Sequence, residues 1–312
     1  MEYLFLGKSD LEVSRFGFGC CPLGGHEWGS VSENEFKDAI SLALDTGINF
    51  FDTADIYGLG ESERRLGKFL KSRRNEVIIS TKFGVRKDNK GTTFYDSTPE
   101  WLGKALDASL VRLGVDHIDL YQIHYLDDMT PVEDTIAALE IKRDEGKIRY
   151  YGFSNISLAD VSGLVNATGA ISFQEEYSLV RRDKEKEIDA ICTEQGLSFI
   201  SWGSLGQGIL SGKYGVETAF GPDDRRSRSV YVNFHGEKLL KNVNMIENIN
   251  KKFASQDKTI SQIAIRWILD RFENSVALVG VKRPSQLLEN IGAFGWKLSL
   301  EEMSYLGSIS SY

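Results

Sequence analysis

Short apolar runs alternate with longer amphipathic segments along the whole chain. The apolar runs are rich in Val, Ile, Phe and Tyr and are too short for helices, which favours buried β-strands. Eight runs are predicted as strands: residues 16–20, 48–52, 77–82, 118–124, 149–154, 171–175, 198–202 and 276–281.

The segments between these runs carry apolar residues at helical spacing. Three of them open on Pro99, Pro131 or Pro284, and proline is favoured in the first turn of a helix. Strict alternation of strand and helix implies right-handed crossovers and parallel strands. Eight such units in 312 residues predict a single (β/α)8 TIM barrel domain over residues 1–312. The predicted helices are residues 34–46, 62–71, 99–113, 131–145, 158–166, 184–194, 261–271 and 284–294.

The composition narrows the class of partner. With 37 Lys and Arg against 45 Asp and Glu, the formal net charge is −8. No basic surplus is present to bind nucleic acid or an anionic membrane, so we expect a small-molecule partner. The start of the chain lacks a leader pattern and no apolar run reaches membrane-spanning length, so a cytoplasmic protein is expected. Three cysteines without paired spacing predict neither a disulfide framework nor a metal site.

Polar residues end several of the predicted strands. In a barrel of this kind the active site lies at the carboxyl ends of the strands. The runs INFFD, VIISTK and IDLYQIH end at Asp52, Lys82 and His124, and Tyr57 follows Asp52 after a short loop. Each residue taken singly has an ordinary structural interpretation, but four complementary groups on adjacent strand ends favour catalysis.

These four side chains suit proton transfer. A tyrosine with its ordinary pKa of about 10 is a poor acid and a worse base at neutral pH. A Lys82 ammonium beside the Tyr57 hydroxyl would favour the phenolate, and Asp52 would hold the lysine in place. His124 would hydrogen-bond a substrate oxygen. The sequence therefore predicts Asp52, Tyr57, Lys82 and His124 as the catalytic residues.

A phosphate site is predicted after the eighth strand. No glycine fingerprint of the doubly wound dinucleotide-binding type follows any strand. The segment GVKRPSQLLENIGAF instead opens a helix with Lys282 and Arg283 at its amino end, where the helix dipole and two cations suit a phosphate. A solvated basic turn is the alternative interpretation.

Three segments resemble signatures of the aldo-keto reductase superfamily, and the similarity runs over essentially the whole chain. GINFFDTADIYGLGESERRLG carries Asp52 and Tyr57, LVRLGVDHIDLYQIH ends at His124, and ISTKFG carries Lys82. The resemblance implies a barrel that binds NADPH without a Rossmann fold and reduces an aldehyde or ketone by hydride transfer. Tyr57 is then the general acid.

The resemblance also implies a set of cofactor contacts. Ser154, Asn155 and Gln174 are expected to bind the nicotinamide carboxamide, and Trp202 is expected to stack on the ring. Lys282 and Arg283 are expected at the 2′-phosphate, which implies NADPH rather than NADH. The other expected contacts are Cys20 at the end of the first strand, Gly203, Ser204, Leu205, Gly206, Gly208 and Lys213 after the stacking residue, and Gln286, Glu289 and Asn290 around the adenine. The chain departs from the family at Cys20 and Cys21, where Thr-Trp is common, and at Gly203, where a hydroxyl residue is usual.

Aromatic residues in or near the expected loops are candidate walls of the substrate pocket. Trp28, Phe83 and Tyr125 are predicted to contact the substrate, and Tyr95, Trp101 and Tyr231 are further candidates. Such walls admit aldehydes, quinones or sugar faces alike. The cluster Arg225, Arg226 and Arg228 has three interpretations: recognition of an anionic substrate, recognition of the cofactor pyrophosphate, or a solvated loop.

Two other functions remain open. A sugar or polyol dehydrogenase would use the same four residues in the oxidative direction. The potassium-channel β subunits resemble the same barrel and act as cofactor-sensing modules, but they depart from the family at the position of His124, which this chain retains. The sequence predicts no oligomeric state and no natural substrate.

Overall fold

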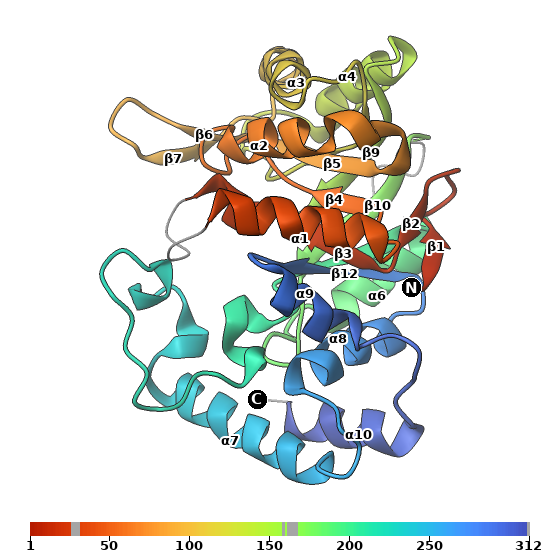
Figure 1. The fold of residues 1–312 in the computed structure, drawn as a ribbon. Helices are drawn as coiled ribbons and strands as arrows, with labels where there is room; N and C mark the ends of the chain where they lie inside the picture. Colours follow the sequence, from red (N-terminus) through yellow and green to blue (C-terminus); the bar gives the residue numbers. More distant parts are fainter. Residues whose placement is uncertain (26–31, 158–159, 161–167, 311–312) are drawn as a thin grey trace.

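The computed structural model describes residues 1–25, 32–157, 160 and 168–310. Eight parallel strands form a closed barrel in the order β10-β11-β12-β3-β4-β5-β8-β9 (Figure 1). Each predicted strand is confirmed to within three residues at each end. The barrel strands are β3 (Phe16–Gly19), β4 (Phe50–Asp52), β5 (Ile78–Phe83), β8 (Ile118–Ile123), β9 (Ile148–Ser154), β10 (Ala170–Glu176), β11 (Ser198–Trp202) and β12 (Ser275–Gly280).

Helices surround the barrel and confirm the predicted single-domain (β/α)8 architecture. Their amino ends follow the expected chemistry, because Thr98 caps one helix and Thr259 forms a capping box with Gln262. The helix predicted over residues 158–166 lies outside the described residues apart from Asp160. The helices that match predicted ones are α1 (Glu33–Asp45), α2 (Glu61–Leu70), α3 (Pro99–Leu113), α4 (Val132–Asp144), α6 (Glu185–Gln195), α8 (Ile260–Arg271) and α9 (Pro284–Ile291).

Several elements lie outside the regular alternation. Helix α7 (Gly236–Lys252) packs against α8, and α10 (Leu300–Ile309) lies beside α7, to which it is joined by the Lys252–Glu301 ion pair (Figure 1). A hairpin of β6 (Val85–Lys87) and β7 (Thr93–Tyr95) follows β5 and projects from the barrel. Three short 3-10 segments occupy the long connection after β11: η3 (Gly206–Ser211), η4 (Arg225–Ser227) and η5 (Val232–Phe234). The sequence marks both connections as long without specifying these elements.

The interior of the barrel is apolar at one end and polar at the other. A hairpin of β1 (Tyr3–Phe5) and β2 (Glu12–Ser14) precedes the barrel. Leu6, Leu11 and Val13 from this region pack with the inward-facing Phe50 and Ile200 near the amino ends of the strands. Because successive strand residues point to opposite sides, the next inward positions toward the carboxyl ends are free to carry the polar side chains of a site. None of the described helices is long and apolar enough to cross a membrane.

Two buried arginines hold the hairpin to the barrel through Glu2. Arg266 is fully buried, and its Nη1 lies 2.8 Å from Glu2 Oε1, while Arg15 Nη1 lies 3.4 Å from Glu2 Oε2. Arg15 also donates to the carbonyl oxygens of Leu269 and Phe272 at 2.8 and 3.0 Å. Glu2 is therefore the carboxylate that both cations share.

Replacing Glu2 tests this arrangement. Glu2→Gln removes the carboxylate that pairs with the buried Arg15, while Arg266 keeps its ion pair with Asp270 at 2.7 Å. Since Glu2 is itself partly exposed, we expect a loss of about 1–3 kcal/mol of unfolding free energy. Urea denaturation measures the loss. Glu12→Gln, at an exposed position of the same hairpin, is the matched control and is expected to change stability by less than about 0.5 kcal/mol. Equal stabilities for the two variants would contradict the shared role of Glu2.

Candidate active site

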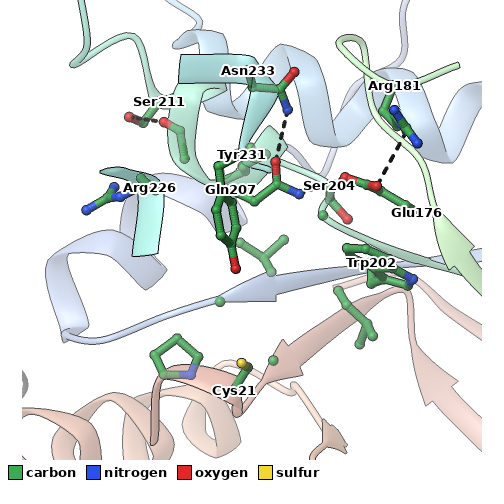
Figure 2. Close-up of a pocket in the computed structure, with 18 of the residues that line it drawn as sticks. Cys21, Glu176, Arg181, Trp202, Ser204, Gln207, Ser211, Arg226, Tyr231 and Asn233 are labelled. Carbon is green, nitrogen blue, oxygen red and sulfur yellow. Dashed lines mark hydrogen bonds and ion pairs between the residues drawn. The ribbon is translucent and has the colours of Figure 1, made fainter. Parts of the chain in front are cut away.

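A cavity of about 890 Å3 opens at the carboxyl ends of the barrel strands. It is lined on one side by strand ends and on the other by the connection that contains η3, η4 and η5 (Figure 2). Asp52, Tyr57 and His124 reach it from the first side, and Tyr231 faces it from the second. The structure thus brings three of the four predicted catalytic residues to one cavity surface.

Lys82 and Asp52 form a buried ion pair beneath the cavity. Lys82 is fully buried, and its ammonium donates to Asp52 Oδ1 at 2.5 Å and to the Thr53 carbonyl at 2.9 Å. The other carboxylate oxygen, Oδ2, accepts from Ser80 Oγ at 3.0 Å and from Gln174 Nε2 at 3.1 Å. Each charge therefore has an opposite partner and at least one further hydrogen bond, which a buried pair needs in order to be stable.

Tyr57 lies above this pair. Its ring centroid is 5.4 Å from the Lys82 ammonium and 5.9 Å from the His124 ring, which it meets edge-on at 86°. Burial raises the pKa of the Tyr57 hydroxyl well above its usual value, and Cys21 and Asp52 act in the same direction. The Lys82 ammonium donates to Asp52 and Thr53. The raised pKa keeps the Tyr57 hydroxyl protonated at neutral pH, and the expectation that Lys82 favours the phenolate stays a prediction.

His124 is a neutral imidazole. Burial, reinforced by the charge of Lys82, lowers its pKa well below the usual value. Its Nδ1 atom is buried without a hydrogen-bond partner among the described residues. The ring stacks on Tyr125 with centroids 5.3 Å apart, and Tyr125 stacks on Tyr95 of the β6–β7 hairpin at 4.8 Å. A neutral imidazole in this place is able to hydrogen-bond an oxygen without adding a charge.

Amide side chains connect His124 to Trp202. Asn155 has a left-handed φ of 54°, and its Nδ2 donates to the His124 carbonyl at 3.1 Å and to Ser154 Oγ at 2.9 Å. The Trp202 indole N–H donates to Asn155 Oδ1 at 3.0 Å. Asn155 and Trp202 line the cavity, whereas Ser154 lies fully buried behind them. The side chain of Asn155 thus fixes the Trp202 indole relative to the backbone of His124.

The far end of the cavity is cationic. Lys213, Arg226 and Lys282 line it, and Arg226 is held by Asp224 through an Nε to Oδ1 bond of 2.8 Å. Burial lowers the pKa of Lys282, and the nearby Arg226 lowers it further, while Asp224 opposes the shift. Arg283 is the N-cap residue of α9 at the same place. The cations crowded at this helix amino end repel one another, and a bound phosphate group would offset that repulsion.

Most of the predicted contact residues line this cavity. Five of them, Cys20, Phe83, Ser154, Gly206 and Arg283, do not line it, and their contacts stay predictions. Cys20 is fully buried with its thiol toward the Phe18 carbonyl, and Cys21 lines the cavity instead. Phe83 is fully buried against Tyr121, with ring centroids 5.0 Å apart, because its position on β5 points away from the barrel interior. Ser154, Gly206 and Arg283 are also absent from the cavity lining, and Trp28 lies outside the described residues. The predicted residues that do line it are Asp52, Tyr57, His124, Tyr125, Asn155, Gln174, Trp202, Gly203, Ser204, Leu205, Gly208, Lys213, Lys282, Gln286, Glu289 and Asn290.

A polar network on the opposite wall was not predicted. Gln207 Nε2 donates to Glu176 Oε1 at 2.7 Å, and Asn233 Nδ2 donates to Gln207 Oε1 at 2.9 Å (Figure 2). Arg181 lies 3.5 Å from the other oxygen of Glu176. These residues come from β10 and from irregular segments, so only the position of Glu176 at a strand end carried a signal in the sequence. Among the described residues, no group of three or more His, Cys, Asp or Glu side chains is arranged to hold a metal ion.

Comparisons with known proteins agree with this geometry. The Aldo/keto reductase family model matches residues 15–311. The chain is 34% identical over 299 residues to "Probable aldo-keto reductase 1" of Glycine max, covering 96% of this chain and 86% of that protein. It is 33% identical over 294 residues to "Aldo-keto reductase yakc [NADP(+)]" of Schizosaccharomyces pombe, covering 92% and 85%. The solved structure of the glycerol dehydrogenase AKR11B4 from Gluconobacter oxydans superposes with a TM-score of 0.90 at 32% identity, covering 98% of this chain and 94% of that one.

The match of the family model over nearly the whole chain agrees with the closed barrel and with the polar groups gathered at its carboxyl face. The chain therefore belongs to the aldo/keto reductase family, whose members are NADP(H)-dependent oxidoreductases that act on carbonyl and alcohol groups.

Proposed function

We propose that this protein uses NADPH to reduce an aldehyde or ketone to the alcohol, with Tyr57 as the general acid. The observation that carries the proposal is the cluster at one end of the cavity, where Tyr57 and the neutral His124 stand over the Lys82–Asp52 pair. A protonated tyrosine in reach of the cavity is the form that donates a proton to a carbonyl oxygen.

The cavity fits an extended dinucleotide. Trp202 supplies a flat apolar surface near Tyr57, and Lys213, Arg226 and Lys282 supply positive charge at the other end. These residues would hold the nicotinamide and the 2′-phosphate respectively, and bound NADPH would supply the hydride. The name of the Schizosaccharomyces pombe relative, which specifies NADP(+), supports the same cofactor.

Each residue of the cluster then has a distinct task. Tyr57 transfers its proton to the substrate oxygen, and His124 hydrogen-bonds that oxygen so that the carbonyl carbon is oriented for reduction. Lys82 places a positive charge below Tyr57, which favours the phenolate that forms as the proton leaves. Asp52 keeps this charge in place. Tyr125 forms an aromatic wall beside the substrate.

Tyr57→Phe tests the acid. The variant keeps the ring and removes only the hydroxyl, so we expect turnover with an aromatic aldehyde such as para-nitrobenzaldehyde to fall by about 10²–10⁴-fold. The dissociation constant of NADPH, measured by quenching of tryptophan fluorescence, should stay unchanged. A near wild-type rate in the folded variant would exclude Tyr57 as the donor.

The pH dependence of the wild type provides a control. Because the pKa of Tyr57 is raised, the hydroxyl stays protonated through neutral and mildly alkaline pH. The rate of carbonyl reduction should therefore remain level in this range and fall only under strongly alkaline conditions. Alcohol oxidation needs the phenolate and should become faster as the pH rises through the same range.

Lys282→Ala tests the cofactor. Loss of one cation at the 2′-phosphate should weaken NADPH binding by about ten- to a hundredfold, since a hydrogen bond to a charged group contributes about 1.5–3 kcal/mol. NADH lacks this phosphate, and its affinity should change little. Lys252→Ala removes a surface lysine paired with Glu301 and serves as the matched control. An equal loss of affinity for NADPH and NADH would contradict a contact between Lys282 and the 2′-phosphate.

Oxidation of a sugar or polyol is a second candidate function. The overlap with a glycerol dehydrogenase from Gluconobacter oxydans favours it, and the same four residues would work in reverse. Comparison of kcat/KM for glycerol with NADP+ and for glyceraldehyde with NADPH at neutral pH separates the two directions. A cofactor-sensing role without turnover is disfavoured by the retained His124.

A further inference from the structure

Two fully buried polar residues, Ser62 and Glu63, lie in the first turn of helix α2, after the loop that carries Tyr57. The other charged residues of this helix are exposed or half-buried. A buried carboxylate is costly unless it is paired. Glu63 Oε1 accepts from Thr81 Oγ1 at 2.6 Å, and Oε2 accepts from Arg112 Nε at 2.5 Å. Glu63 thus connects α2 to strand β5 and to helix α3.

The contact on β5 lies directly behind the buried ion pair. Thr81 stands between Ser80 and Lys82, both of which face the barrel interior and bond to Asp52. Since side chains alternate along a strand, Thr81 faces outward, toward α2. Glu63 therefore bonds to the outward-facing Thr81 hydroxyl, directly next to the position on β5 from which Lys82 projects inward.

Ser62 holds the other side of the same junction. Its backbone N–H donates to the Tyr57 carbonyl at 3.2 Å, and its hydroxyl donates to the Cys20 carbonyl at 2.8 Å and lies 2.8 Å from Thr53 Oγ1. Ser62 is thus bonded to Thr53 at the start of the loop, to the backbone of Tyr57, and to Cys20, which follows β3. Ser62 and Glu63 together connect the Tyr57 loop to β3, β5 and α3.

The loop has little room to shift. Gly58 has a φ of +62°, and a side chain there would place its Cβ 2.3 Å from the Gly24 carbonyl oxygen. The Asp55 N–H donates to the Lys82 carbonyl at 3.2 Å. Burial and the neighbouring Glu63 raise the pKa of Asp55 to about 8, so it is largely neutral at pH 7 and leaves the guanidinium of Arg112 to Glu63.

We propose that Ser62 and Glu63 are positioning residues for the reaction, which set the distance between the Tyr57 hydroxyl and the Lys82 ammonium. The inference rests on the proposed function, in which Tyr57 gives up its proton above that ammonium. A shift of the loop by a fraction of an ångström would leave the cofactor groove intact but slow proton transfer. We therefore expect such a shift to lower kcat and to leave KM unchanged.

Thr81→Val is the test, because it keeps the shape of the side chain and removes only the hydroxyl that Glu63 accepts from. We expect kcat for NADPH-dependent reduction of para-nitrobenzaldehyde to fall by about ten- to a hundredfold, as misplacement of reacting groups does. KM for the aldehyde and the dissociation constant of NADPH should stay near wild type. The solvent deuterium isotope effect on kcat should increase, because proton transfer then limits turnover to a greater degree.

Three further variants define the result. Thr81→Ser keeps the hydroxyl and should restore kcat, and Ser62→Ala should reproduce the loss by releasing the other side of the loop. Lys68→Gln removes an exposed ion pair with Glu33 on the same helix and should leave all values unchanged.

The outcomes separate a positioning role from a structural one. If Thr81→Val and Ser62→Ala lower only the unfolding free energy, with wild-type kcat and isotope effect, the inference is wrong. A loss of NADPH affinity in proportion to kcat would also overturn it, because it would assign the residues to cofactor binding. If the wild type shows no turnover, or Tyr57→Phe none of the expected loss, the proposed function itself fails.

Discussion

The buried pair of Asp52 and Lys82 is the interaction on which the site depends. A lysine with no exposed surface loses its hydration, and only a carboxylate and further acceptors at close range compensate for that loss. Strand register supplies both, because Asp52 ends β4 while Ser80 and Lys82 occupy successive inward positions on β5. The remaining oxygen of Asp52 accepts from Ser80, Gln122 and Gln174, so one carboxylate organises polar groups from β5, β8 and β10.

The two ends of the barrel differ in the side chains that fill its interior. Near the amino ends, Leu6, Leu11 and Val13 fill the interior, and Glu2 joins two buried arginines there. At the carboxyl ends the interior positions carry charged and amide side chains. Burying these groups costs free energy, and the stability of the packed barrel offsets that cost. Above them the long connection after β11 adds the far wall of the cavity and two of its cations, Lys213 and Arg226. The same strands therefore carry a packed core near their amino ends and the cavity at their carboxyl ends.

The fold was predictable because alternation of strand and helix is a strong periodic signal, and the strand ends pointed to Asp52, Lys82 and His124. The direction in which individual side chains point was harder to predict. Phe83 is next to Lys82 in sequence but points to the opposite side of β5. The thiol of Cys20 is buried toward the Phe18 carbonyl, and the next residue, Cys21, lines the cavity. The ionisation of Tyr57 depends on burial, which no sequence pattern reports. The wall of Glu176, Gln207 and Asn233 depends on an irregular backbone, with Gln207 at a φ of 55°.

The central claim is that Asp52 and Lys82 act as one unit, and a double-mutant cycle on the unfolding free energy tests it most directly. Asp52→Asn and Lys82→Met each leave one buried charge without its partner, so each should cost about 3–5 kcal/mol in urea denaturation. The double variant removes both charges, and it should lose much less than the sum of the two single losses. Additive losses would contradict the account, because they would show that the two side chains contribute independently.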